Sequence, residues 1–154
     1  MALHLHLLLP EILVAAAALA VVAADMLVPA DRRARVAPVV AGLGLACAFA
    51  VLLFARPEGD AVLGHFSSDA FSRFVRILAT GGGLLLVALS SAYTRRMDRG
   101  HGEFYGILLL ALTGVMLVSG VQDLMSLFVC LELVTILSYA VSYTHLTLPT
   151  TSRV

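Results

Sequence analysis

The sequence predicts an all-helical integral membrane protein with five transmembrane helices, and two observations lead to this fold class. The first is composition: 60% of the 154 residues are hydrophobic, the mean hydropathy is +0.99, and only 13% are charged. A soluble domain normally carries about a quarter charged residues, so a lipid bilayer is the solvent that suits this chain. The second is the presence of five apolar segments, each close to the roughly 20 residues that span a hydrocarbon core of about 30 Å.

Each apolar segment is expected to be a helix, because backbone groups inside lipid must form their hydrogen bonds within the segment. The first segment is interrupted by Pro10, Glu11 and Asp25, and the third contains the run Gly81–Gly83. Small residues let transmembrane helices pack closely, whereas consecutive glycines can also form a hinge, so the glycine run has two interpretations. The expected helices are residues 7–28, 36–55, 71–93, 103–121 and 123–141.

The charge of the connecting segments predicts the orientation of the chain in the membrane. The loops at residues 31–35 and 94–103 are rich in arginine, whereas the longer stretch at residues 56–72 is mainly acidic. Arginine-rich loops remain in the cytoplasm, so the N-terminus is expected to face the outside. Arg73 and Arg76 would then lie at the outer mouth of the third helix, where long side chains can snorkel to the interface.

Glu132 is the first candidate functional residue, because it is an acid inside the apolar fifth segment. It follows Leu124 by eight positions, which places it about 12 Å into the segment. That depth is close to the middle of a core about 30 Å thick. A charge there costs at least ~2.5–3.5 kcal/mol on insertion scales, and intramembrane acids are therefore functional candidates by default.

A carboxyl group at this depth suits a proton relay, because burial favours its neutral form and a nearby cation favours its charged form. Thr135 and Tyr139 follow Glu132 by three and seven positions, on the same helix face, and their hydroxyl groups could support the carboxyl group. The alternative interpretation is structural: a protonated Glu132 that hydrogen-bonds a neighbouring helix. No basic side chain is found at matching depth in the second to fourth segments.

The other acids suggest structural roles. Glu11 lies four residues into the first segment and is expected to reach the outer interface, and Asp25 is expected to pair with Arg32 or Arg33. An acid also suits the positive end of a helix dipole or an N-cap. Two further acids are therefore expected to stand at the starts of the fourth and fifth helices: Glu103 and Asp123.

Several kinds of chemistry are excluded by what the sequence contains. The two cysteines, Cys47 and Cys130, lie in apolar segments and are expected to be buried and inert. The histidines have no ligand spacing on one helix, and no phosphate-binding or dinucleotide-binding motif is present, so no metal or nucleotide site is expected. The formal net charge is zero, which argues against a nucleic-acid partner.

The end of the chain has a different composition. The peptide at residues 141–150, VSYTHLTLPT, resembles the in-frame translation of a transposon-end sequencing adapter. We therefore expect the natural protein to be truncated near Ala140 in this chain and residues 141–154 to be an adapter artefact, to which no role is assigned.

Two stretches carry a family resemblance. Residues 102–105 give a Glu-Phe-Tyr start to the fourth helix, and residues 123–133 read Asp-Leu-x-x-Leu-Phe-x-x-Leu-Glu-Leu. With the Pro10-Glu11 opening and the entry to the third helix at residues 69–74, this pattern resembles subunit N of bacterial NADH-quinone oxidoreductase (complex I). The resemblance covers most of residues 7–140.

The resemblance implies a fourteen-helix antiporter-like subunit of which this chain holds the first five helices. Glu132 would match the family's helix-five glutamate, which acts in proton translocation and pairs with a lysine on helix seven. The chain would be a non-redox subunit of a proton-translocating NADH:quinone oxidoreductase in the bacterial inner membrane, inactive as a fragment.

Its partners would be other membrane subunits and the lipid bilayer. FMN, iron–sulfur clusters and quinone would belong to other subunits. The alternatives are a cation/proton antiporter, a hydrogenase-linked homologue, or a membrane scaffold in which Glu132 is structural.

Overall fold

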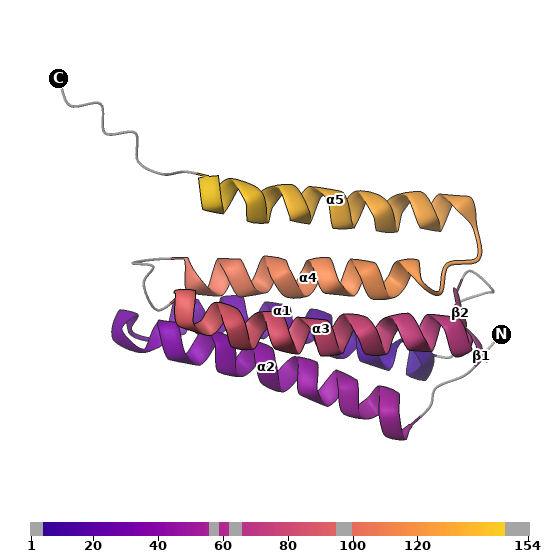
Figure 1. The fold of residues 1–154 in the computed structure, drawn as a ribbon, viewed down its shortest axis with the longest axis horizontal. Coiled ribbons are helices and arrows are strands. Elements are labelled where there is room, and N and C mark those ends of the chain that lie inside the picture. The colour runs from indigo at the N-terminus through magenta and orange to yellow at the C-terminus, as the bar shows by residue number, and fades with distance from the viewer. Residues whose placement is uncertain (1–4, 56–58, 62–65, 95–99, 147–154) are drawn as a thin grey trace.

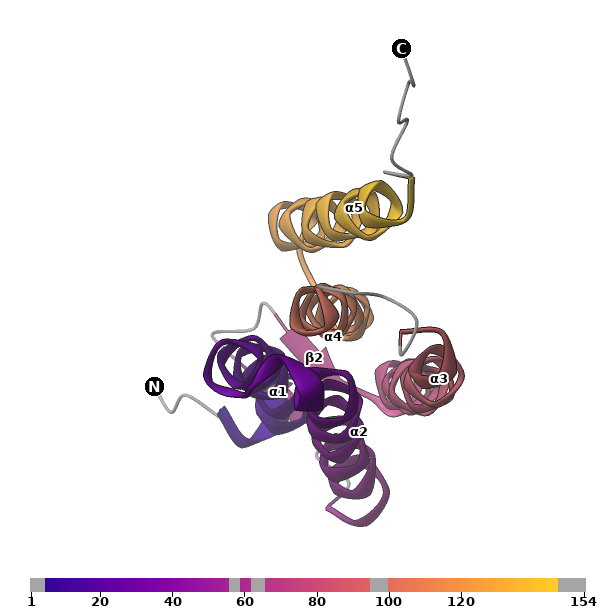
Figure 2. The ribbon, with the colours of Figure 1, turned by 90° about the vertical axis from the view of Figure 1, so that its left-hand side faces the viewer.

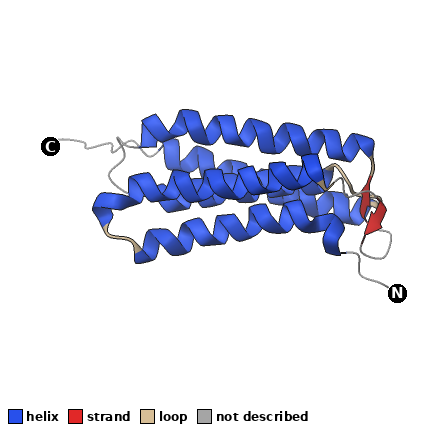
Figure 3. Ribbon diagram, turned by 90° about the horizontal axis from the view of Figure 1, so that it is seen from below, coloured by secondary structure: helices blue, strands red, loops and turns tan. Residues whose placement is uncertain are grey.

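The computed structural model describes residues 5–55, 59–61, 66–94 and 100–146. Within these residues the chain forms five long helices, each antiparallel to the one before it, with a small pair of strands at one end of the bundle (Figures 1 and 3). The elements are η1 (Leu5–Leu8), α1 (Leu9–Leu27), α2 (Ala30–Phe54), β1 (Gly59–Ala61), β2 (Phe66–Ser68), α3 (Ala70–Thr94), α4 (His101–Val118) and α5 (Leu124–Leu146).

The first two helices are joined by a tighter connection than the sequence predicted. Pro10 lies in the first turn of α1, where its fixed φ suits a helix start, and α1 ends at the extended Val28 before Pro29. The expected loop at residues 31–35 is wrong, because α2 begins at Ala30 and includes these residues in its first turns. The arginines of this segment are therefore on a helix.

A short β-hairpin follows α2, and the sequence analysis did not predict it. Strands β1 and β2 pair antiparallel, and Phe66 forms a further bridge with Val121. The backbone N–H of Ser67 donates to the carbonyl oxygen of Gly120 at 2.7 Å. Because the chain after α4 pairs with β2 in this way, α4 ends at Val118 rather than at the expected residue 121.

The four helices α1 to α4 form a bundle, and α5 lies outside it against α4 (Figure 2). Helices α1 and α3 each pack against both α2 and α4, so they face one another diagonally across the bundle. The core consists mainly of small and aliphatic side chains, among them Val14, Val21, Leu45, Leu52 and Leu109.

Glycine allows the helices of the bundle to approach closely. A Cβ atom on Gly83 would lie 2.6 Å from Cδ1 of Leu112 and 3.3 Å from Cδ1 of Leu45. Helix α3 runs through the glycine run without interruption. These contacts support close packing at Gly83 rather than a hinge.

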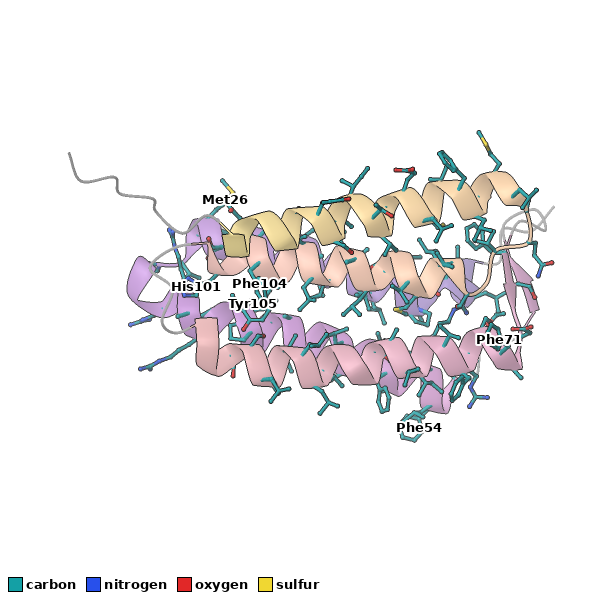
Figure 4. The ribbon with its side chains drawn as sticks, turned by 45° about the horizontal axis from the view of Figure 1, so that its top comes forward. Met26, Phe54, Phe71, His101, Phe104 and Tyr105 are labelled. Atoms are coloured by element: carbon teal, nitrogen blue, oxygen red, sulfur yellow. The ribbon has the colours of Figure 1, made fainter. Side chains whose placement is uncertain are left out.

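The outer surface of the bundle is apolar, as expected for lipid contact. Phe54 and Met26 point away from the bundle and are 86% and 80% exposed, whereas Tyr105 points into it and is fully buried (Figure 4). Cys130 is buried as predicted, but the prediction for Cys47 is wrong, because its position on α2 is exposed.

Four helices are long and apolar enough to cross a membrane: α1, residues 32–54 of α2, residues 70–91 of α3, and α4. The apolar part of α5, residues 124–140, is shorter. The predicted all-helical, multi-pass membrane fold is therefore confirmed. Helix α5 continues to Leu146, past the expected end at residue 141, and residues 147–154 lie outside the described part. The adapter origin of residues 141–154 stays a prediction.

Candidate functional site

Glu132 lies on the face of α5 that points away from α4. Helix α5 is capped as predicted by Asp123, whose Oδ1 accepts a hydrogen bond from the backbone N–H of Ser126 at 2.9 Å. The side of α5 that contacts α4 carries Val134, which a Cβ atom on Gly114 would meet at 2.7 Å. Glu132 precedes Val134 by two positions, which places it on nearly the opposite side of the helix, and it is exposed.

Thr135 and Tyr139, the two residues predicted to support Glu132, lie on the same helix. No hydrogen bond from either hydroxyl group to the Glu132 carboxyl group is described. The hydroxyl group of Thr135 donates to the carbonyl oxygen of Leu131 at 2.8 Å, within its own helix. Tyr139 is 65% exposed and helps to line a shallow pocket of about 280 Å³ with Thr135 and Ser138. The supporting role of Thr135 and Tyr139 stays a prediction.

Unlike Glu132, the acid Glu11 in α1 is buried, contrary to the sequence prediction. Glu11 was expected to reach the outer interface, and Arg76 was expected to snorkel there. Instead they are 3% and 1% exposed, and Nε of Arg76 lies 2.7 Å from Oε1 of Glu11. Burying one charge alone is costly, whereas paired charges tolerate burial, so the arginine side chain reaches inward to the acid rather than outward.

Further polar groups surround this ion pair. Nη1 of Arg76 donates to the hydroxyl group of Ser68 in β2 at 2.9 Å. On α3, Ser72, Arg76 and Thr80 are spaced by four residues and are all buried, so they form one polar stripe facing the core. This spacing is visible in the sequence and is the signal that could have revealed the buried arginine.

The start of α3 is capped by a reciprocal pair of hydrogen bonds. The backbone N–H of Ser72 donates to Oδ1 of Asp69 at 2.7 Å, and the backbone N–H of Asp69 donates to the Ser72 hydroxyl group at 3.0 Å. The N–H of Ser72 is the main reason why the pKa of Asp69 lies below its usual range, and the charge of Arg76 adds to it. Asp69 is therefore an exposed carboxylate beside the buried pair.

At the opposite end of the bundle, Asp25 forms a contact that the sequence did not predict. Its Oδ1 accepts a hydrogen bond from the backbone N–H of Gly102 at 3.2 Å, at the start of α4. Pairing with Arg32 or Arg33 was expected. Nε of Arg33 donates to the carbonyl oxygen of Val28 at 2.8 Å, and pairing with Arg32 stays a prediction. Asp25 thus ties α1 to α4, while Glu103 lies in the first turn of α4 as predicted.

No cluster of three or more histidine, cysteine or acidic side chains that could hold a metal ion occurs in the described ranges of the chain. A groove of about 560 Å³ between α3, α4 and α5 is lined mostly by apolar side chains, with Asp69, Ser119 and Gln122 as its polar members.

The fold and these acids define a class: a multi-pass helical membrane protein with carboxyl groups inside its apolar segments. Comparison with known proteins makes the class specific. The chain is 37% identical over 143 residues, or 93% of its length, to NADH-quinone oxidoreductase subunit N of Moorella thermoacetica. It is 34% identical over 149 residues, or 94% of its length, to the subunit N of Geobacillus kaustophilus.

A third relative, from Thermosynechococcus vestitus, is named NAD(P)H-quinone oxidoreductase subunit 2 and is 36% identical over 134 residues. No family model matches the chain. The chain spans 30% of the length of the Moorella and Geobacillus relatives. These matches confirm the resemblance to subunit N of NADH-quinone oxidoreductase, the name that these two relatives carry.

Proposed function

We propose that this chain is part of a membrane subunit of bacterial NADH-quinone oxidoreductase through which protons cross the membrane while quinone is reduced elsewhere in the complex. The observation that carries the proposal is Glu132, an acid about 12 Å into α5 by helical rise, on the face that α4 leaves open. The similarity to subunit N over more than nine-tenths of the chain supports this assignment.

The chemistry of the proposal is the changing charge of one carboxyl group. Under this proposal Glu132 is the group that takes up and releases the proton. When a cation approaches the open face of α5, the anion is favoured and the proton leaves. Under this proposal the cation comes from a part of the subunit beyond these five helices, and the chain itself holds no FMN, iron–sulfur cluster or quinone.

The proposed orientation places the N-terminus outside the inner membrane. The end of the bundle at the α1–α2 connection carries Arg32, Arg33 and Arg35, and basic residues beside transmembrane helices favour the cytoplasmic side. The proposed partners are lipid and the other membrane subunits of the complex, which the exposed apolar helix faces would contact.

The test is Glu132→Gln in the full-length subunit, in assembled complex reconstituted into liposomes. We expect NADH-driven proton pumping to fall about tenfold or more with normal assembly, since a positioned acid–base group contributes about 10²–10⁴-fold to proton transfer. Glu103→Gln is the matched control, because Glu103 is an exposed acid in the first turn of α4, and it should pump normally.

Unchanged pumping in a normally assembled Glu132→Gln complex would overturn the proposal. That result would favour a structural Glu132, because glutamine keeps hydrogen-bonding capacity without the charge. Cation exchange across the membrane in the absence of NADH and quinone, lost in Glu132→Gln, would instead favour the antiporter alternative.

A further inference from the structure

We propose that Glu11 is a second proton-binding carboxyl group in this molecule, and that it exchanges its proton with water at the end of the bundle where Asp69 lies. Arg76 would alternate between the two acids, pairing with Glu11 when Glu11 is charged and with Asp69 when it is protonated. This site goes beyond the proposed function, because its proton binding does not depend on whether the complex pumps.

The first support is the incomplete pairing of a deeply buried carboxylate. Nε of Arg76 is 2.7 Å from Oε1 of Glu11 and forms an ion pair with it, but no hydrogen bond is described between the two groups. Within the described residues no donor forms a hydrogen bond with either oxygen of Glu11. A buried carboxylate whose oxygens lack hydrogen bonds is costly in its charged form, and a bound proton removes that charge.

The second support is the position of Arg76 between a buried acid and an exposed one. Its Nη1 already donates to Ser68, the residue directly before Asp69, at 2.9 Å. Its Nη2 is so close to the end of α4 that a Cβ atom on Gly120 would lie 2.9 Å from it. The guanidinium group therefore reaches from the core side, at Glu11, to the strand that leads to the exposed carboxylate of Asp69.

The third support is the short list of other charges near Glu11. Of the side chains that the structure describes, α2 and α4 bring no ionisable group to this end of the bundle. Helix α3 brings Arg73 and Arg76, and Asp69 and Asp123 stand at the starts of α3 and α5. Of the described side chains, Arg76 is the cation that forms an ion pair with Glu11, so the position of Arg76 bears directly on whether Glu11 holds a proton.

The exchange is balanced in protons and charge. The Glu11 carboxylate takes one proton from a hydronium ion, which forms one O–H bond and leaves one water molecule. Arg76 keeps its proton throughout, since a guanidinium group does not titrate in proteins. The net charge of Glu11, Arg76 and Asp69 together rises from −1 to 0, and Arg76 then has Asp69 as its anionic partner.

The experiment uses the full-length subunit in lipid nanodiscs and infrared difference spectroscopy between neutral and acidic pH. The readout is the carbonyl stretch of a protonated carboxylic acid, which shifts in heavy water. We expect this band to include a component that is lost in Glu11→Gln and kept in the matched variant Glu132→Gln. Asp69→Asn should move that component to lower pH, because Arg76 then has Glu11 as its nearest acid.

A double variant serves as a control for loss of the fold in Glu11→Gln. Glu11→Gln combined with Arg76→Gln removes both buried charges and should keep native helicity, yet still lack the Glu11 component of the band. A spectrum that is the same in Glu11→Gln and the unaltered chain would overturn the proposal, as would a Glu11 component that Asp69→Asn leaves at the same pH. Loss of pumping in Glu132→Gln has no bearing on either result, so the two proposals fail separately.

Discussion

Replacement of Arg76 by methionine tests the buried ion pair through the stability of the bundle. The side chains of Arg76 and Glu11 are 1% and 4% exposed, so methionine would leave the acid buried without its cation. Breaking a buried pair by removing one partner costs about 3–5 kcal/mol of unfolding free energy. The bond to Ser68 contributes to that loss, since a charged hydrogen bond is worth about 1.5–3 kcal/mol.

The informative comparison is the double variant Glu11→Gln with Arg76→Met. Removing both charges of a buried pair is often neutral or stabilising, by up to about 4 kcal/mol. We therefore expect the double variant to recover most of the stability that the single variant loses. The assay is unfolding of the chain in mixed micelles of a mild detergent and dodecyl sulfate, followed by circular dichroism.

Arg35→Gln is the control for this comparison, because Arg35 is an exposed arginine on α2, and its unfolding free energy should change by no more than about 0.5 kcal/mol. The reasoning fails if the double variant is as unstable as Arg76→Met alone. It also fails if Arg76→Met unfolds at the same detergent fraction as the unaltered chain.

Two further predictions concern helix contacts and acid stability. Gly83→Val should cost about 1–3 kcal/mol, because its Cβ would lie 2.6 Å from Leu112, whereas Gly82→Ala has nothing within 4 Å and should stabilise α3 by up to about 1 kcal/mol. The same micelle unfolding assay measures both, and equal effects would contradict the packing argument. Because the pKa of Asp69 is lowered in the fold, its stabilisation is present above the ordinary carboxylate range and declines as pH falls through the folded value. Asp69→Asn should therefore weaken the acid dependence of unfolding below that range, and an unchanged profile would refute this.

The sequence predicted the helices well because lipid leaves few alternatives to them. Apolar length fixed the approximate bounds of α3, expected at residues 71–93 and found at Ala70–Thr94. The acid at the start of α5 was also predictable, since capping by Asp123 depends on only four consecutive residues. The hairpin was not predicted, and the bridge from Phe66 to Val121 could not be, because Val121 lies far along the chain.

The candidate site divides in the same way. The depth of Glu132 follows from counting residues along one helix. The pairing of Glu11 with Arg76 could not be predicted in this way, because it depends on how α1 and α3 are placed in the bundle. The sequence around Arg76 favoured snorkelling instead. The bond from Gly102 to Asp25 was missed for the same reason, because the two residues lie 77 positions apart in the sequence.

The diagonal pair also has a consequence for how the chain enters the membrane. Helix α1 is synthesised first and carries Glu11, and α3 emerges only after α2 and the hairpin. An arginine inside an apolar segment opposes insertion by as much as about 2.5–3.5 kcal/mol at the centre of a helix. If α1 is already in the membrane when α3 enters it, Arg76 can pair with Glu11 at once. We therefore expect the first and third helices to enter the membrane cooperatively, because their charges are paired in the folded bundle.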